Sequence, residues 1–110
     1  MGINKVNETS SKIETVISRD YALTTLCILH PLEITFDIND QNFYVWYPRT
    51  KIVDGRGVDI SEVYGFGKTL NEAALNYVRK INGNNCMFDG DEISYKLIFY
   101  RDYDDIEREV

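Results

Sequence analysis

The segment Gly65-Phe66-Gly67-Lys68-Thr69 is the first candidate for chemistry, because Gly-Lys-Thr also ends the loop that binds nucleotide phosphates. That loop needs another glycine five residues before the Gly-Lys step, so that backbone amides can wrap around the phosphates. Glu62 occupies this position, and its carboxylate repels phosphate. We therefore interpret the segment as the glycine-flanked exit of a strand, followed by Thr69 as a helix N-cap.

Two cysteines and one histidine are the other candidates for catalysis or metal binding. Cys27 and His30 would share a face of a helix, and Cys86 could approach them in space. A thiol nucleophile needs a nearby base and an electropositive setting, and the sequence indicates neither. We therefore expect no enzyme activity, no catalytic residue, no cofactor and no metal site, since these ligands are too few for ordinary zinc binding. A thiol or carboxylate hydrolase is the alternative in the enzyme class.

Carboxylates form two clusters near the end of the chain, and neither cluster has the spacing of a calcium-binding EF-hand. In the second cluster tyrosines alternate with the acids, so rings that can pack stand beside charges that can pair with Arg or Lys. Such a surface is suited to a cationic groove built for phosphate. The predicted partner-binding residues are Asp89, Asp91, Glu92, Tyr100, Asp102, Tyr103, Asp104, Asp105 and Glu107.

The charge of the chain is concentrated in the same region. The 110 residues carry a net charge of -6, and residues 89–110 contribute eight acids against three bases. Because no Lys/Arg cluster is present, we expect no direct nucleic-acid binding and favour a basic protein surface as the partner. The sequence contains no apolar segment of signal-peptide or membrane-span length, so we expect a cytoplasmic protein without membrane contact.

The first third of the chain is expected to be helical. Residues 1–10 are polar and are predicted to be a flexible N-terminal arm. Ser11 and Glu14 match a capping box, and apolar residues continue at helical spacing as far as His30. This pattern predicts one bent helix or two short ones, although residues 21–29 are also apolar enough to form a buried strand.

The remaining elements follow from the change of hydrophobic period. Residues 32–38 and 43–47 alternate around a polar turn and predict a hairpin, and short strands are expected at 51–53 and 58–64. Thr69 and Glu72 form a second capping box before an apolar stripe that ends at Ile81, which predicts a helix. Residues 93–100 alternate and predict a long last strand.

These elements predict an α+β fold, in which the N-terminal helix or helix pair and the central amphipathic helix pack on a small antiparallel sheet of three to four strands. The domain is expected to span residues 11–103, with residues 104–110 as an acidic C-terminal tail. The strand at 43–47 has aromatic residues on both faces. Either the first helices cover the second face, or a partner or a second copy of the chain does, as in a homodimer.

Residues 64–75, Tyr-Gly-Phe-Gly-Lys-Thr-Leu-Asn-Glu-Ala-Ala-Leu, resemble the step into the helix of HicB-like antitoxin domains. The resemblance implies a sheet with a helix packed on it, in an antitoxin or regulatory dimerisation domain. The segment is also similar in spacing to the last helix entry of double-stranded-RNA-binding domains. Those domains carry lysines where this chain has Leu70, Asn71 and Glu72, so no RNA binding is inferred.

The composition, with 12 Ile, 9 Asn and 8 Tyr against 3 Ala, resembles that of accessory proteins of phages and other mobile elements. Many of these are stoichiometric inhibitors of host defence or replication enzymes, including anti-CRISPR proteins. The leading hypothesis is therefore a small acidic, non-enzymatic inhibitor that binds the basic, nucleic-acid-binding surface of a host protein. The HicB-like antitoxin or regulatory dimerisation domain is the alternative.

Overall fold

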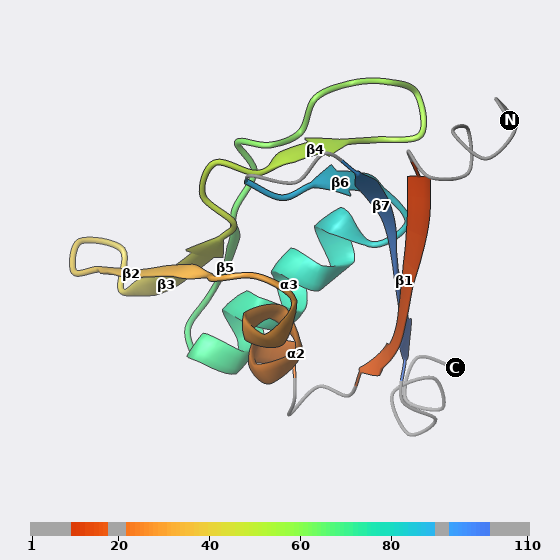
Figure 1. The fold of residues 1–110 in the computed structure, drawn as a ribbon. Helices are drawn as coiled ribbons and strands as arrows, with labels where there is room; N and C mark the ends of the chain where they lie inside the picture. The colour runs from red at the N-terminus through yellow and green to blue at the C-terminus, as the bar shows by residue number, and fades with distance from the viewer. Residues whose placement is uncertain (1–9, 18–21, 90–92, 102–110) are drawn as a thin grey trace, which may run out of the picture.

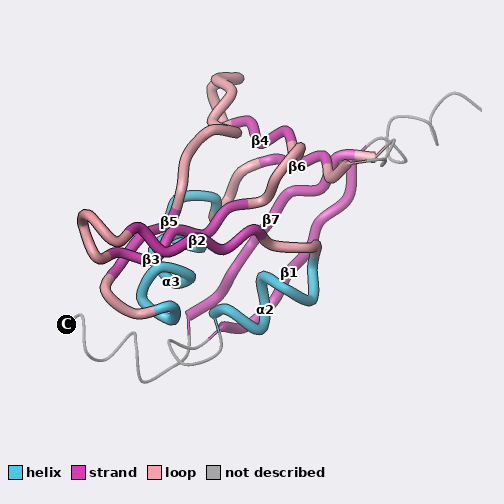
Figure 2. Tube along the Cα trace, turned by 90° about the vertical axis from the view of Figure 1, so that its left-hand side faces the viewer, coloured by secondary structure: helices cyan, strands magenta, loops and turns pink. Residues whose placement is uncertain are grey.

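The computed structural model describes residues 10–17, 22–89 and 93–101 and confirms the α+β class. Its strands form two sheets, of four strands in the order β1-β7-β6-β4 and of three strands in the order β2-β3-β5 (Figures 1 and 2). The elements in chain order are β1 (Ser10–Ile17), α2 (Ala22–Leu29), β2 (Glu33–Asp37), β3 (Asn42–Trp46), β4 (Lys51–Val53), β5 (Gly65–Gly67), α3 (Leu70–Ile81), β6 (Asn85–Met87) and β7 (Ser94–Arg101).

The prediction of a helix beginning at Ser11 is wrong for the first half of that helix. Residues 10–17 form β1, which pairs in parallel with β7 and places Ile13 opposite Leu97. This segment is rich in β-branched residues, which favour strands, and the long β7 offers it an edge. The second half is helical, because Ala22–Leu29 forms α2. Ser10 belongs to β1, and the rest of the predicted N-terminal arm lies outside the described residues.

The predicted hairpin is confirmed as β2 and β3, in which Thr35 lies opposite Tyr44. The third strand expected at 58–64 is wrong: apart from a single bridge between Val53 and Asp59, the strand lies later, as β5, and pairs with β3. The short strand at 51–53 is confirmed as β4. Its partner β6 was not predicted, because its first residue, Asn85, is typical of turns.

The amphipathic helix predicted after Thr69 is confirmed as α3, and its N-cap forms as the capping pattern indicates. The Glu72 amide donates to Thr69 Oγ1 at 3.1 Å. The helix packs closely on β5, because a Cβ on Gly65 would lie only 2.3 Å from the Ala73 carbonyl oxygen. At the other end of α3, the side-chain oxygen of Asn82 accepts a hydrogen bond from the Phe99 amide in β7.

One hydrophobic core joins both sheets and both helices. Two tyrosines connect its parts through buried hydrogen bonds: the Tyr47 hydroxyl donates to the Leu26 carbonyl in α2 at 2.6 Å, and the Tyr77 hydroxyl in α3 accepts from the Tyr47 amide at 3.0 Å. Neither helix is long and apolar enough to cross a membrane in the part of the chain that the structure describes.

Helix α3 packs on one face of the three-stranded sheet, and no helix covers the opposite face (Figure 1).

Candidate functional site

The outer face of the three-stranded sheet carries four aromatic side chains. Successive residues of a strand point to opposite faces, so Val45 faces α3 and is buried, whereas Tyr44 and Trp46 point outward. In β5 the two glycines face α3, which places Phe66 on the outer face opposite Tyr44. Tyr64 lies two residues before Phe66, just outside β5, and its side chain points to the same face. We call Tyr44, Trp46, Tyr64 and Phe66 the aromatic face.

The four rings of the aromatic face form a continuous row. The Tyr44 and Phe66 centroids are 5.7 Å apart and their planes are inclined by 28°. The Tyr64 ring contacts Tyr44 and Trp46 edge-on, with centroid distances of 6.4 Å and 5.1 Å. Tyr64 is 44% exposed and Phe66 is 47% exposed. Tyr44 and Trp46 are half-buried, and Trp46 also packs against the core. Aromatic rings that pack on one another at a partly exposed surface are typical of surfaces that bind another macromolecule.

Carboxylates lie along the β2 side of this row and in the adjoining hairpin turn. Glu33 lies opposite Trp46 in the β2-β3 register, and Asp37 lines a hollow of about 280 Å³ with Thr35, Tyr44, Trp46 and Tyr64. Asp40 in the hairpin turn accepts a hydrogen bond from the Tyr44 hydroxyl, and this bond is the main cause of the raised pKa of that phenol. We call Glu33, Asp37 and Asp40 the acidic rim. A ligand on the aromatic face would meet negative charge at its border.

Two lysines near the face are engaged by main-chain carbonyls. Lys68 Nζ donates to the Asp40 carbonyl at 3.0 Å. Lys80 Nζ donates to the Tyr64 carbonyl at 2.5 Å and lies 5.1 Å from the centre of the Phe66 ring. Both ammonium groups therefore hold the sheet and the adjoining turn in place at the edges of the aromatic face.

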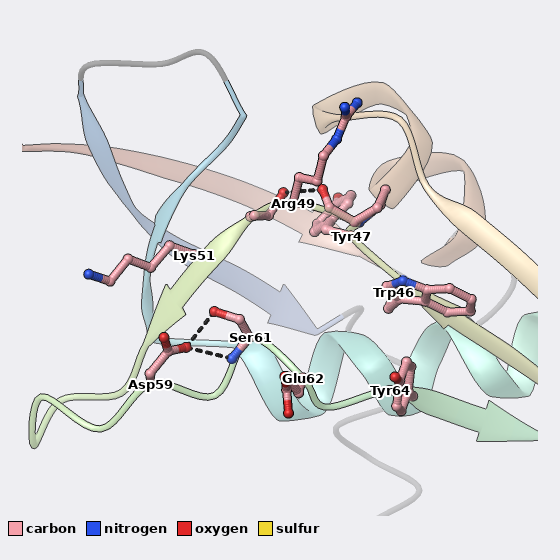
Figure 3. Close-up of a pocket in the computed structure, with 10 residues that line it drawn as sticks. Trp46, Tyr47, Arg49, Lys51, Asp59, Ser61, Glu62 and Tyr64 are labelled. Atoms are coloured by element: carbon pink, nitrogen blue, oxygen red, sulfur yellow. Dashed lines mark hydrogen bonds between the residues drawn. The ribbon is translucent and has the colours of Figure 1, made fainter.

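A groove of about 570 Å³ continues from the aromatic face and shares Trp46 and Tyr64 with it (Figure 3). In this groove the Ser61 hydroxyl accepts from the Ile52 amide at 2.9 Å and donates to Asp59. This bond and the bond from the Ser61 amide to the same carboxylate lower the pKa of Asp59. Figure 3 shows Arg49, Lys51 and Glu62 pointing in different directions. The groove residues labelled there bring no acid, base and nucleophile to one point.

No family model, curated protein or solved structure matches the chain significantly. The local resemblance of residues 64–75 to HicB-like domains stays a prediction, although these residues do form the step from β5 into α3.

The predicted acidic site is only partly placed. Asp89 is exposed and lies 3.6 Å from the Arg49 guanidinium, and Tyr100 is part of β7, where its backbone pairs with Val16. The other predicted partner-binding residues lie outside the described residues: Asp91, Glu92, Asp102, Tyr103, Asp104, Asp105 and Glu107. The role of the acidic C-terminal region therefore stays a prediction.

The two thiols differ in exposure, and the histidine packs among aromatic rings. Cys27 is exposed on α2, while Cys86 is buried in β6. The His30 ring packs against Phe88 at 4.7 Å and Tyr47 at 5.9 Å. Within the described ranges no three His, Cys, Asp or Glu side chains are grouped to hold a metal ion.

Sequence reasoning missed Tyr64 and Phe66 as site residues. The signal was present as the alternation Tyr64-Gly65-Phe66-Gly67, in which rings occupy one side of a strand and glycines the other. Small residues on one side indicate close packing against another element, and the rings must then face solvent or a partner.

Proposed function

We propose that the protein is a non-enzymatic interaction protein that binds a basic surface of another protein through the aromatic face and its acidic rim. The observation that carries this proposal is the row of four contacting rings, of which Tyr64 and Phe66 are exposed, with carboxylates along its β2 side. Arginine suits both parts of such a surface, because its guanidinium stacks on aromatic rings and forms paired hydrogen bonds with carboxylates.

Aromatic rings on a sheet also bind single-stranded nucleic acids, but those sheets combine the rings with a cationic groove. Here the net charge is -6, and Glu33, Asp37 and Asp40 stand beside the rings. Phosphates would be repelled by this border. The charge therefore favours a protein partner that itself binds nucleic acid.

A partner covered in this way loses access to its nucleic acid. The function proposed is thus stoichiometric inhibition in the cytoplasm, of the kind that phage and mobile-element accessory proteins, including anti-CRISPR proteins, exert on host proteins. The acidic region around Asp104 and Asp105 extends the same charge and is a second contact in this proposal. The alternative, a HicB-like antitoxin or regulatory domain, would use the same face to hold a small toxin.

The proposal is tested by comparing what the tagged protein and two variants retain from a lysate of its source cells. Tyr64→Ala combined with Phe66→Ala removes half of the aromatic face. Val58→Ala is the matched control, since Val58 is an exposed apolar residue outside the aromatic face, the acidic rim and the groove. Circular dichroism melts establish that all three chains are folded.

We expect the wild type and Val58→Ala to retain the same nucleic-acid-binding protein, and the double variant to retain at least about tenfold less, since central aromatic anchors are worth about 2 kcal/mol or more. An excess of oligonucleotide should release the retained protein. Equal retention by the double variant would contradict the proposed contact surface. Retention of only a small co-encoded protein, unaffected by oligonucleotide, would support the antitoxin-like alternative instead.

A further inference from the structure

The two edges of the three-stranded sheet differ in whether their outward main-chain groups have partners. At the β5 edge, α3 covers the outward main-chain groups: the Asn76 side-chain amide donates to the Phe66 carbonyl at 2.7 Å, and Lys80 Nζ donates to the Tyr64 carbonyl. At the other edge, β2 pairs with β3, and no other strand of the described chain pairs with it. The hairpin projects from the body of the protein, so this edge is accessible (Figure 1).

The side chains of β2 protect its free edge only by the negative charges at its two ends, Glu33 and Asp37. Natural edge strands are usually protected by charged side chains, lysines above all, or by prolines or bulges. In β2, Ile34 is 43% exposed and Phe36 is 47% exposed on the face turned toward α3. On the opposite face, Glu33 and Asp37 flank Thr35. The strand is therefore apolar on one side and acidic on the other.

We infer that the free edge of β2 binds an extended segment of the partner in which basic and apolar side chains alternate. This inference rests on the proposed function, which requires a basic partner. An added strand would bond to the outward amides and carbonyls of β2, as in β-strand addition. Its lysines or arginines would lie opposite Glu33 and Asp37, and its apolar side chains would cover Ile34 and Phe36.

A second copy of the chain fits the same edge less well. The antiparallel register that pairs the whole strand with itself is centred on Thr35 and places Ile34 opposite Phe36. It also places Glu33 of each copy opposite Asp37 of the other, and like charges directly opposite each other destabilise a strand pair. Charge complementarity therefore favours a basic segment of a different protein.

The test uses a short fluorescein-labelled peptide in which Lys and Val alternate, and a control peptide of the same composition with its lysines grouped at one end. Fluorescence anisotropy measures the Kd of each peptide for the full chain. Hydrogen exchange followed by NMR locates the contact. Glu33→Lys reverses a charge on the β2 edge, and Glu62→Lys makes the same charge change at an exposed groove residue outside β2.

We expect the alternating peptide to bind, to slow amide exchange in β2, and to bind about fivefold more weakly to Glu33→Lys, because a cross-strand ion pair contributes up to about 1 kcal/mol. Glu62→Lys and the grouped peptide are the controls for net charge, because the first changes the protein's charge equally and the second has the same charge as the alternating peptide. Absence of binding, equal binding of the two peptides, or equal weakening by both variants would overturn the inference. A dimer seen by light scattering and strengthened by Glu33→Lys would assign the edge to a second copy and also overturn it.

The inference and the proposed function can fail separately. The lysate comparison is therefore repeated with Glu33→Lys and with Glu62→Lys. Reduced retention with Glu33→Lys but not with Glu62→Lys is the result expected. If the Tyr64→Ala and Phe66→Ala variant loses its partner while Glu33→Lys retains it fully, the proposed contact through the aromatic face stands, Glu33 is not part of that contact, and the strand-addition inference fails.

Discussion

At the scale of single residues, Gly65 determines how closely α3 approaches the sheet. The space that a side chain on Gly65 would need is occupied by the Ala73 carbonyl and by the Cβ of Tyr77, both 2.3 Å from the expected Cβ position. This close approach forces the aromatic side chain of Phe66 to the opposite face. The glycine therefore contributes both to the core and to the position of the candidate site.

Gly65→Ala is predicted to destabilise the protein by at least about 1–3 kcal/mol, the usual cost of overpacking a core against backbone. Urea unfolding measures the change. Gly55→Ala is the control, because nothing lies within 4 Å of its added Cβ and its φ is not positive, so its free energy of unfolding should change little. Equal effects of the two substitutions would contradict the packing described here.

The two buried tyrosines of the core make the stability of the folded state depend on pH in alkaline solution. Burial raises the pKa of Tyr77 to about 12 and raises that of Tyr47 even further. The neutral phenol is thus favoured in the folded state, so the stability that these groups contribute is complete below their ordinary pKa of 10 and is lost as the pH rises through the folded-state value.

A titration of phenolate absorbance should therefore show two phases. Exposed tyrosines ionise first, with the fold intact, and the buried pair ionises later, together with loss of the circular dichroism signal. The account would be wrong if all tyrosines ionised in one step near pH 10 in a protein that stays folded.

At the scale of elements, the sequence predicted what depends on neighbours in the chain. The stripe from Leu70 to Ile81 and the Thr69 cap are local signals, and α3 forms as expected. β1 was mistaken for a helix because its pairing depends on β7, which lies far away in the sequence. The candidate site also depends on pairing between distant segments. The sequence predicted aromatic rings on both faces of β3, but the spacing of residues along the chain does not give the register that places Phe66 opposite Tyr44.

Helix α2 is held to the core through the Tyr47 hydroxyl, which donates to the Leu26 carbonyl. Tyr47→Phe removes this donor and leaves the Leu26 carbonyl with the longer bond from the His30 amide, at 3.3 Å. We therefore expect a loss of about 0.5–1.5 kcal/mol and a larger increase of hydrogen exchange in α2 than in α3. Tyr64→Phe is the control, because it removes the hydroxyl of a 44% exposed tyrosine. Unchanged exchange in α2 would show that this bond does not anchor the helix.

At the scale of the whole molecule, charge determines the kind of partner that the surface can accept. The acidic rim and the acidic C-terminal region have the same sign, and together they attract a cationic surface from a distance. Association with the partner should therefore be fast at low salt and slow down as salt is added, because the Debye length falls to about 8 Å at physiological ionic strength. Stopped-flow mixing at several salt concentrations measures this, and a rate independent of salt would contradict an electrostatic encounter.

The central claim is that the aromatic face contacts the partner, and photo-crosslinking in the source cells tests it most directly. The photoreactive residue p-benzoylphenylalanine replaces Tyr64 in one variant and Tyr103, in the predicted acidic site, in another. We predict that irradiation links position 64 to a nucleic-acid-binding protein with a basic surface. Crosslinks from position 103 alone, or from neither position, would contradict the claim.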